Sequence, residues 1–332
     1  MSDRPEPLLS AVGLVRELPV RAWWQRGRTG VLAVDGLDLE VHEREVVAVT
    51  GVAGSGRTTL GRLLSGDLSP SGGRVLVDGQ ALADAPSGSV VLLPLPTAAR
   101  LPRRATAGAL LFPADGSLSR AALVAQLAER VGVTPDLLDR RIDHLASDER
   151  RAVLVALALG ALPRLVVLDG ETDVDPGLRA GIQGALGLLR EQVGTAVVVL
   201  AAAGEPMPQA DRLVVLDSGR IVEDGAPGDL ARQALHPLSD RLLSGPRDAT
   251  GPAAGTPGRA EQAPTGCAYR DRCALAQDVC ASARPRLERP LGASHRVACH
   301  FPLHLRVPDP AGPGRVIVLP DAEPTAWEFA RD

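Results

Sequence analysis

The sequence contains no lysine and no asparagine, so all 36 of its basic residues are arginine. Aromatic residues make up only 2% of the chain, although the hydrophobic fraction is 45%. We therefore expect an aliphatic core that consists mainly of Leu, Val and Ala. The complete absence of lysine indicates a strong compositional bias, which weakens any functional argument from a single arginine in a lysine position.

A positive net charge, a long apolar run and a secretion signal are also missing. The net charge is −4, which excludes the basic surface expected of a nucleic-acid-binding protein. The longest apolar run, Ala152 to Leu162, is too short to cross a bilayer. The N-terminal residues show no basic start followed by an apolar middle, so secretion is not expected. With 332 residues, the chain can bury one large core and carry an appendage.

The most informative motif is the segment Gly51 to Thr59, which reads G-V-A-G-S-G-R-T-T. Its glycines and hydroxyls match a phosphate-binding loop, but Arg57 occupies the position of the usual lysine. The strand-like run 45–50 precedes the segment and the amphipathic run 58–64 follows it. A strand, a glycine-rich turn and a helix in this order are the context that such a loop requires.

Within this loop, glycines without a Cβ let backbone N–H groups approach phosphate oxygens at a helix N-terminus. The predicted nucleotide-binding residues of the loop are Gly51, Gly54, Ser55, Gly56, Arg57, Thr58 and Thr59. Thr58 offers a hydroxyl to Mg²⁺. Arg57 still attracts phosphate, but its wide guanidinium cannot reproduce a compact ammonium between the β- and γ-phosphates. The alternative interpretation is a glycine-rich turn without a ligand.

The chain divides into four regions by composition. Residues 8–245 alternate short Val/Leu strands with helical stretches, which is typical of an α/β domain with parallel strands. A mostly helical stretch at about 97–160 interrupts this alternation and is predicted to be an inserted subdomain. Residues 246–266 form a Gly/Pro/Ala-rich linker, 267–302 contain all four cysteines, and 303–332 form a Pro-rich tail.

The chain resembles the ATP-binding subunits of oligopeptide and dipeptide ABC transporters. The resemblance rests on the phosphate-binding loop and on segments 63–73, 165–169, 211–216, 219–225 and 235–243. It implies an ABC-type P-loop nucleotide-binding domain with an inserted helical subdomain and a C-terminal cysteine-containing extension. It also implies ATP and Mg²⁺ as ligands.

The same resemblance implies the partners of the chain. A second ATP-binding subunit would pair with it head to tail, beneath two transmembrane permease subunits, and a substrate-binding protein would take part indirectly. The chain would then lie peripherally on the cytoplasmic side of the cell membrane. The Leu-Ser-Gly-Gly-Gln signature of each ATP-binding subunit would contact the nucleotide of the other.

Several positions that the resemblance marks as catalytic carry residues that cannot perform the chemistry. The glutamate expected after Asp169 is replaced by Gly170, and Glu171 comes one residue late, which redirects its side chain. Ala202 occupies the position of the switch histidine, and the glutamine expected near Pro94 is absent. We therefore predict a degenerate subunit with weak or no hydrolysis at its own site. The alternative is a non-catalytic scaffold or a redox-responsive regulator.

Other groups of the nucleotide site are retained. Asp169 ends a strand-like run, as a carboxylate near Mg²⁺ should, and Thr58 and Asp175 are further candidates to hold Mg²⁺ and nucleotide. Adenine usually stacks on an aromatic residue upstream of the loop, and Trp23 and Trp24 are in reach. The alternative is that these tryptophans pack against lipid or a membrane subunit.

The signature motif is degenerate as well. It aligns with Leu145, Ala146, Ser147, Asp148 and Glu149. Ser147 and Asp148 replace two glycines, and Asp148 would place a negative charge near the nucleotide of the partner. We favour a structural interpretation, in which the segment begins a helix with Ser147 or Asp148 as the cap.

The four cysteines are Cys267, Cys273, Cys280 and Cys299, with the spacing C-x5-C-x6-C-x18-C. Four thiolates suit Zn²⁺ or an iron–sulfur cluster, because both bind soft sulfur ligands. The family resemblance implies a 4Fe–4S cluster, with Zn²⁺ as the alternative. Free buried thiols remain the third interpretation. His295 and His300 flank Cys299 and are predicted to cap or pack rather than to bind metal.

Overall fold

The computed structural model describes residues 6–20, 29–93, 101–112, 118–169, 175–203, 205, 207, 209–243 and 265–303. Several sequence predictions fall outside these ranges. They concern Trp23, Trp24, Pro94, Gly170, Glu171, most of the linker 246–266 and the tail from residue 304.

The main sheet of the described residues has seven strands in the order β11-β10-β9-β3-β8-β7-β6. Its strands are β3 (Val46–Gly51), β6 (Val90–Leu93), β7 (Leu165–Asp169), β8 (Ala196–Leu200), β9 (Arg212–Asp217), β10 (Arg220–Gly225) and β11 (Arg296–Val297). Strand β3 pairs in parallel with β8 and β9, and β7 pairs in parallel with β6 and β8. Parallel pairing brings the carboxyl ends of β3, β7 and β8 to one edge, where open α/β sheets bind ligands.

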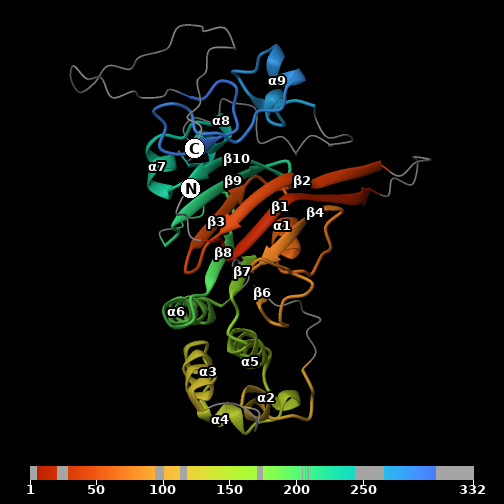
Figure 1. Ribbon diagram of the computed structural model, residues 1–332. Coiled ribbons are helices and arrows are strands. Elements are labelled where there is room, and N and C mark those ends of the chain that lie inside the picture. The colour runs from red at the N-terminus through yellow and green to blue at the C-terminus, as the bar shows by residue number, and fades with distance from the viewer. Residues whose placement is uncertain are drawn as a thin grey trace, which may run out of the picture.

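A second sheet is antiparallel, and the sequence analysis did not distinguish it from the first. It has the order β2-β1-β4-β5. Its strands are β1 (Leu9–Val20), β2 (Thr29–Val41), β4 (Gly72–Val77) and β5 (Gln80–Ala81). Helix α1 (Arg57–Leu64) shares one apolar core with both sheets, as shown by Leu14, Val47 and Leu60 in the same buried cluster. The phosphate-binding loop therefore enters a helix that is fixed on two sides (Figure 1).

Helices gather at one end of the molecule (Figure 1). They are α2 (Ala107–Leu111), α3 (Leu118–Arg130), α4 (Pro135–Leu138), the short 3-10 helix Ile142–His144 and α5 (Ser147–Gly160). All lie within the range 97–160 that the sequence predicts to be helical. Helix α6 (Pro176–Gln192) lies between them and the main sheet, and one apolar core joins α3, α5 and α6 to β7.

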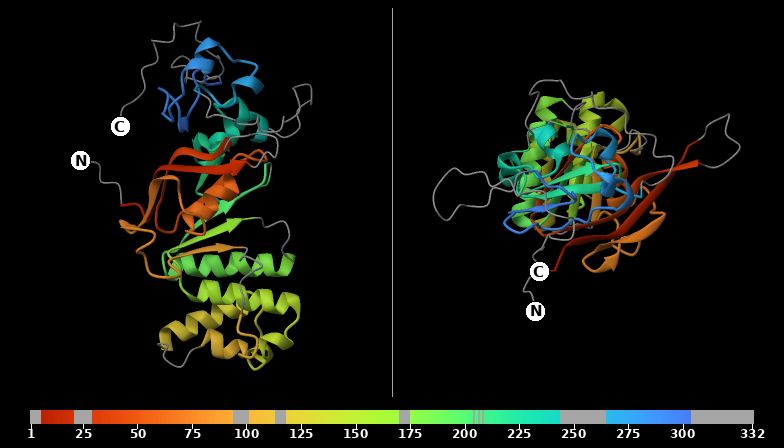
Figure 2. Two further views of the ribbon diagram at one scale, coloured as in Figure 1. Left: turned by 90° about the vertical axis from the view of Figure 1, so that its right-hand side faces the viewer. Right: turned by 90° about the horizontal axis from the view of Figure 1, so that it is seen from above.

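The cysteine-bearing segment lies at the opposite end of the molecule (Figure 2). It contains the 3-10 helix Arg270–Arg272, helix α9 (Asp278–Ser282) and strand β11. Strand β11 pairs with β10, so the segment extends the main sheet. Helices α7 (Pro227–Arg232) and α8 (Pro237–Leu243) precede it, and Tyr269 joins their apolar core. No helix of the described residues is long and apolar enough to span a membrane.

Close packing of α6 against the end of α3 predicts the effect of one added methyl group. A Cβ at Gly181 would overlap the carbonyl oxygen of Arg130, whereas a Cβ at Gly187 on the same helix would meet nothing within 4 Å. Gly181→Ala should lower the free energy of unfolding by roughly 1–3 kcal/mol, because backbone atoms must move to admit it. Urea unfolding of the purified protein measures the change.

Gly187→Ala is the matched control. It should leave stability unchanged or raise it by up to about 1 kcal/mol, since alanine favours helix more than glycine does. Equal effects of the two substitutions would contradict the predicted contact between α3 and α6.

Candidate nucleotide-binding site

Backbone crowding explains the glycines of the phosphate-binding loop. Gly54 and Gly56 adopt φ values of 77° and 102°, which side-chain-bearing residues rarely adopt. A Cβ at Gly56 would overlap the carbonyl oxygen of Ala33, and a Cβ at Gly51 would overlap that of Leu216. The loop therefore packs closely against β2 and β9, and Gly51 and Gly56 lie where a side chain would not fit.

The loop presents polar groups without protein partners. Ser55 is 1% exposed, and its Oγ has no hydrogen-bond partner within the described residues. Gly56 is the N-cap of α1, and no side chain caps this helix. The first N–H groups of a helix are an anion-binding site when no side chain satisfies them. The residues present thus fit the phosphates of a nucleotide.

A hydroxyl and a carboxylate lie together beside the loop. The Oγ1 atom of Thr58 lies 3.4 Å from the Oδ1 atom of Asp169, which ends β7. These are the groups that the sequence analysis assigns to Mg²⁺, and oxygen ligands are what this ion prefers. Two segments more than a hundred residues apart therefore supply one candidate cation site, because β3 and β7 end at the same sheet edge.

Arg57 is half-buried beside the same carboxylate. Burial lowers the pKa of Arg57 from its ordinary value, while the nearby charges of Asp169 and Glu205 oppose this shift. Arg57 is thus a cation under the influence of two carboxylates. Glu205 was missed by the sequence analysis, since no motif contains it. It follows β8, and its Oε2 accepts a hydrogen bond of 2.9 Å from the Ala202 N–H.

Ala202 lies at the carboxyl end of β8, where the family resemblance expects a histidine. Its carbonyl oxygen accepts a hydrogen bond of 3.3 Å from the Thr50 hydroxyl, and its methyl side chain is exposed. A methyl group can neither donate nor accept a proton. The position is therefore close to the loop but has no acid–base function.

Asp175 has a structural role that differs from the predicted one. Its Oδ1 accepts hydrogen bonds from the N–H groups of Gly177 and Leu178, at 2.8 and 3.2 Å. It is the N-cap of α6 and precedes Pro176, a favourable residue for the first helical position. One oxygen of this exposed carboxylate is therefore used to start a helix, and its contribution to Mg²⁺ or nucleotide binding stays a prediction.

The segment that the sequence analysis aligns with the signature begins a helix, but its cap differs from the expectation. The N-cap of α5 is Ala146, and Ser147 and Asp148 are already helical, so neither caps the helix as predicted. Glu149 supplies the missing interaction, because its Oε2 accepts a hydrogen bond of 2.7 Å from the Ala146 N–H. Asp148 and Glu149 lie in the first turn, where the helix dipole favours negative charge. Leu145 is buried just before it.

The four cysteines are free thiols within the C-terminal extension. Burial, with a smaller contribution from the charges of the other three cysteines, raises the pKa of Cys299 to about 12. Burial also raises the pKa of Cys267 and Cys273. The Cys267 N–H donates a hydrogen bond of 2.8 Å to the Cys280 carbonyl, so these two residues lie side by side. However, the described residues include no group of three or more metal-ligand side chains placed to hold a metal ion.

The two histidines that flank Cys299 pack as predicted. The Nε2 of His295 lies 2.6 Å from the Oε1 of the fully buried Glu223, and the Nε2 of His300 lies 2.9 Å from the Ala283 carbonyl. The carboxylate of Glu223 also accepts hydrogen bonds from the N–H groups of Leu235 and His236. This buried network holds the extension to β10 and to the start of α8.

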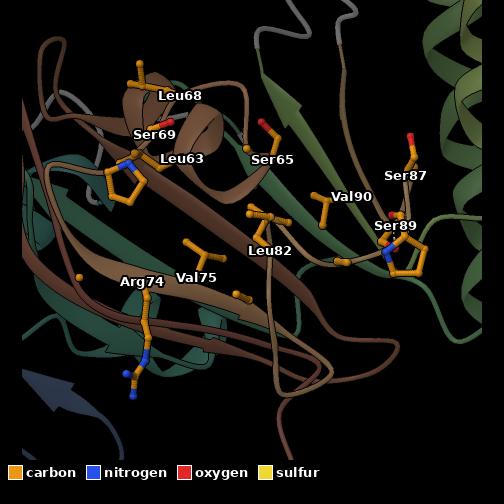
Figure 3. Close-up of a pocket in the computed structure, with 18 residues that line it drawn as sticks. Leu63, Ser65, Leu68, Ser69, Arg74, Val75, Leu82, Ser87, Ser89 and Val90 are labelled. Atoms are coloured by element: carbon orange, nitrogen blue, oxygen red, sulfur yellow. Dashed lines mark hydrogen bonds between the residues drawn. The ribbon is translucent and has the colours of Figure 1, made fainter.

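A hollow of about 430 Å³ lies beyond the C-terminal end of α1 (Figure 3). Leu63, Leu68, Leu82 and Val90 contribute apolar side chains, and serines line its rim. Among the described residues that line it, Arg74 is the one that carries a charge. With a single cation and no carboxylate, this hollow lacks the groups that bind a triphosphate and Mg²⁺. The loop at the other end of α1 has them.

The fold and the loop define an ABC-type nucleotide-binding domain. The family profile described as ABC transporter matches residues 34–173. A solved structure of an ATP-binding subunit of an ABC transporter superposes with a TM-score of 0.55 at 18% identity, over 68% of this chain and 92% of that chain. The ADP-bound structure of an ABC transporter cassette gives a TM-score of 0.52 at 19% identity, over 73% and 96%. These structures support the fold alone.

Sequence relatives show which members of this family the chain is similar to. A putative peptide import ATP-binding protein of Brucella abortus is 32% identical over 322 residues, which cover 90% of this chain and 95% of the relative. A probable D,D-dipeptide transport ATP-binding protein of Escherichia coli is 30% identical over 279 residues, 78% of this chain and 87% of the relative. The chain belongs to the ABC transporter family of ATP-binding proteins, in the group that contains these relatives. The family resemblance seen in the sequence is confirmed.

His236 predicts a pH dependence of stability. Burial lowers its pKa from 6.5 to about 4, with Arg272 acting in the same direction and Glu223 opposing it. The unfolded chain therefore binds a proton between these pH values that the folded chain does not, so stability falls as pH drops from 6.5 toward 4. The loss should reach about 3 kcal/mol. Urea unfolding across this pH range measures it.

His236→Gln is the control, because glutamine keeps an acceptor for the Leu238 N–H that now binds the Nδ1 of His236. The difference in stability between the parent and this variant should shrink as pH falls. A difference that stayed constant from pH 7 to pH 4 would show that His236 does not titrate in this way.

Proposed function

We propose that this chain is the ATP-binding, energy-coupling subunit of a peptide ABC importer, with weak or no hydrolysis at its own site. The observation that carries the proposal is a glycine-rich loop that enters α1 without a side-chain cap among the described residues, beside Ala202, which has no acid–base function. The peptide assignment rests on what the relatives are named for.

The phosphates of ATP would be held by the loop backbone at the N-terminus of α1. The guanidinium of Arg57 would add charge attraction at the loop edge. Thr58 and Asp169 would hold Mg²⁺ from one side, and water and phosphate oxygens would complete its ligands. When bound, ATP supplies the phosphoanhydride bond whose hydrolysis at an intact site drives transport.

Chemistry at this site is expected to be slow. A positioned general base contributes about 10²- to 10⁴-fold to rate, and neither Gly170 nor Ala202 can serve as one. Arg57 replaces a compact ammonium with a wider cation, so it stabilises the negative charge on the transferred phosphoryl group less well in the transition state. These losses affect the rate of cleavage more than the affinity for ATP.

A second ATP-binding subunit is the proposed partner. The start of α5 would face the nucleotide of that subunit, and Asp148 would place a carboxylate near its phosphates. Such repulsion weakens the partner's site, while the helix start keeps its structural function. Two permease subunits would bind the pair at the cytoplasmic face of the membrane, and a substrate-binding protein would deliver the peptide to them.

The alternative function is a non-catalytic scaffold or a redox-responsive regulator of the same transporter. Its support is the cysteine-bearing extension, which packs into the apolar core with β9 and β10 through Tyr269, Cys267 and Cys273. In this case binding of ATP would preserve the shape of the assembly, and no turnover would be required.

For the extension we propose a 4Fe–4S cluster bound by Cys267, Cys273, Cys280 and Cys299, with Zn²⁺ as the alternative. Four soft sulfur donors in one small unit support it. The raised pKa values of Cys267, Cys273 and Cys299 mean that these three thiols are neutral near pH 7 without metal, so metal binding would release protons.

The purified chain should bind MgATP but hydrolyse it slowly. Thr58→Ala should weaken MgATP binding by about tenfold, because one oxygen ligand of Mg²⁺ is lost. Its melting temperature should not change, since the Thr58 side chain is exposed.

The double variant Gly170→Glu with Ala202→His should raise the rate of phosphate release at least tenfold over the parent. Equilibrium dialysis with labelled ATP and a phosphate-release assay measure these effects.

Ser65→Ala is the control, because it removes a hydroxyl from the other end of α1 and should leave MgATP binding unchanged. ATP binding that is undetectable at millimolar concentration would exclude the proposed function. Rapid phosphate release by the parent chain alone would contradict the degenerate site.

Anaerobically purified protein should contain about four iron and four sulfide ions per chain, with a broad visible absorption band. Cys280→Ser should abolish both, because it removes one of the four sulfur ligands. Zinc in place of iron would favour the alternative site. Protein that contains neither metal after reconstitution would show that the four cysteines are structural thiols.

A further inference from the structure

The two-residue turn between β9 and β10 is hydrogen-bonded to the phosphate-binding loop. Its residues, Ser218 and Gly219, both have positive φ values of 49° and 78°, as tight hairpin turns require. The Gly219 N–H donates a hydrogen bond of 2.8 Å to the carbonyl oxygen of Ser55. The Gly219 carbonyl accepts one of 3.0 Å from the Asp35 N–H. The turn is thus bound both to the loop and to β2.

Asp217 precedes this turn and is a buried charge. It ends β9 and its side chain is 0% exposed. Both of its carboxylate oxygens accept hydrogen bonds of 2.7 Å from the Nη2 atom of Arg272. A buried carboxylate requires such a partner, because an unpaired charge in the interior is strongly unfavourable. The position of Asp217, and of the turn that follows it, therefore depends on Arg272.

Arg272 comes from the cysteine-bearing extension, 55 residues further along the chain. Its guanidinium lies 4.7 Å from the ring centre of Tyr269. The backbone N–H of Arg272 donates a hydrogen bond of 2.9 Å to the Tyr269 carbonyl. Tyr269 is buried against His236, with 5.4 Å between the ring centres. The Arg272 side chain is only 15% exposed. The extension thus holds this arginine in one orientation, directed at β9.

We propose that Arg272 is a positioning residue of the nucleotide site. By fixing Asp217, it holds the Ser218–Gly219 turn against Ser55, and so keeps the loop backbone in the conformation that receives the phosphates. The inference rests on the proposed function, because it concerns the affinity for ATP. The cysteine-bearing extension would thus act on the phosphate-binding loop through the Arg272–Asp217 pair and the hydrogen bond between Gly219 and Ser55.

The affinity of the full-length chain for MgATP tests this connection. Arg272→Ala should weaken binding by about tenfold or more, because the buried carboxylate of Asp217 loses both hydrogen bonds from Arg272, which the nearby charge of Arg220 does not replace, and the turn must shift. Arg272→Lys keeps the charge but loses the paired geometry, so its affinity should lie between those of the parent and Arg272→Ala. Binding is measured well below the melting temperature of each variant, so that lost folding does not mimic lost affinity.

Arg270→Ala is the matched control. Arg270 lies in the same 3-10 helix and contacts the exposed Asp271, so its loss should leave ATP affinity unchanged. Asp217→Asn serves if Arg272→Ala does not fold, since it keeps the shape of the side chain and should weaken binding similarly. The double variant Asp217→Asn with Arg272→Ala should lose no more affinity than either single variant.

The outcomes separate the inference from the proposed function. A parent chain that binds no ATP would overturn both. A parent that binds ATP, with Arg272→Ala and Asp217→Asn folded and equally tight, would overturn this inference alone. Losses that add fully in the double variant would also overturn it, because two residues that act through one contact are not additive.

Discussion

Backbone crowding around the carbonyl oxygen of Ala33 is the constraint on which the nucleotide site depends. Gly56 of the phosphate-binding loop and Gly219 of the β9–β10 turn both approach this oxygen so closely that neither position can accept a Cβ. Three segments from different parts of the chain therefore meet with only backbone between them. Because the loop cannot spread, its N–H groups stay directed toward the space above α1, which gives an anion a prepared site.

Much of this arrangement could be predicted from the sequence, because its signals are local. The glycine frame 51–59 lies between a Val-rich strand and an amphipathic helix, and the structure forms both, as β3 and α1. The aliphatic run that ends at Asp169 forms β7. Hydrophobic periodicity and turn chemistry operate over a few residues, so they can be read without knowledge of the fold.

The features that the sequence analysis missed are of two kinds, namely helix caps whose assignment needs the exact start of the helix, and one contact between distant segments. Asp175 is next to a predicted catalytic stretch, yet its position before Pro176 makes it a helix cap. Glu149 takes the capping interaction that was expected from Ser147 or Asp148. The pairing of Arg272 with Asp217 spans two regions that composition alone separates. The two caps are local, and they were missed because the first residue of each helix was placed wrongly or not at all. The pairing of Arg272 with Asp217 has no short pattern, because tertiary packing brings the two residues together.

The two-residue strand β11 has a consequence for how the chain can be shortened. Beyond its pairing with β10, the Ala298 N–H donates to the Val222 carbonyl at 2.8 Å. Removal of everything after residue 245 would uncover the flank of β10 and leave Glu223 buried without His295. Exposed strand flanks template self-association. A version trimmed to the nucleotide-binding fold is therefore expected to precipitate or form fibres, although the composition marks residue 246 as a natural place to cut.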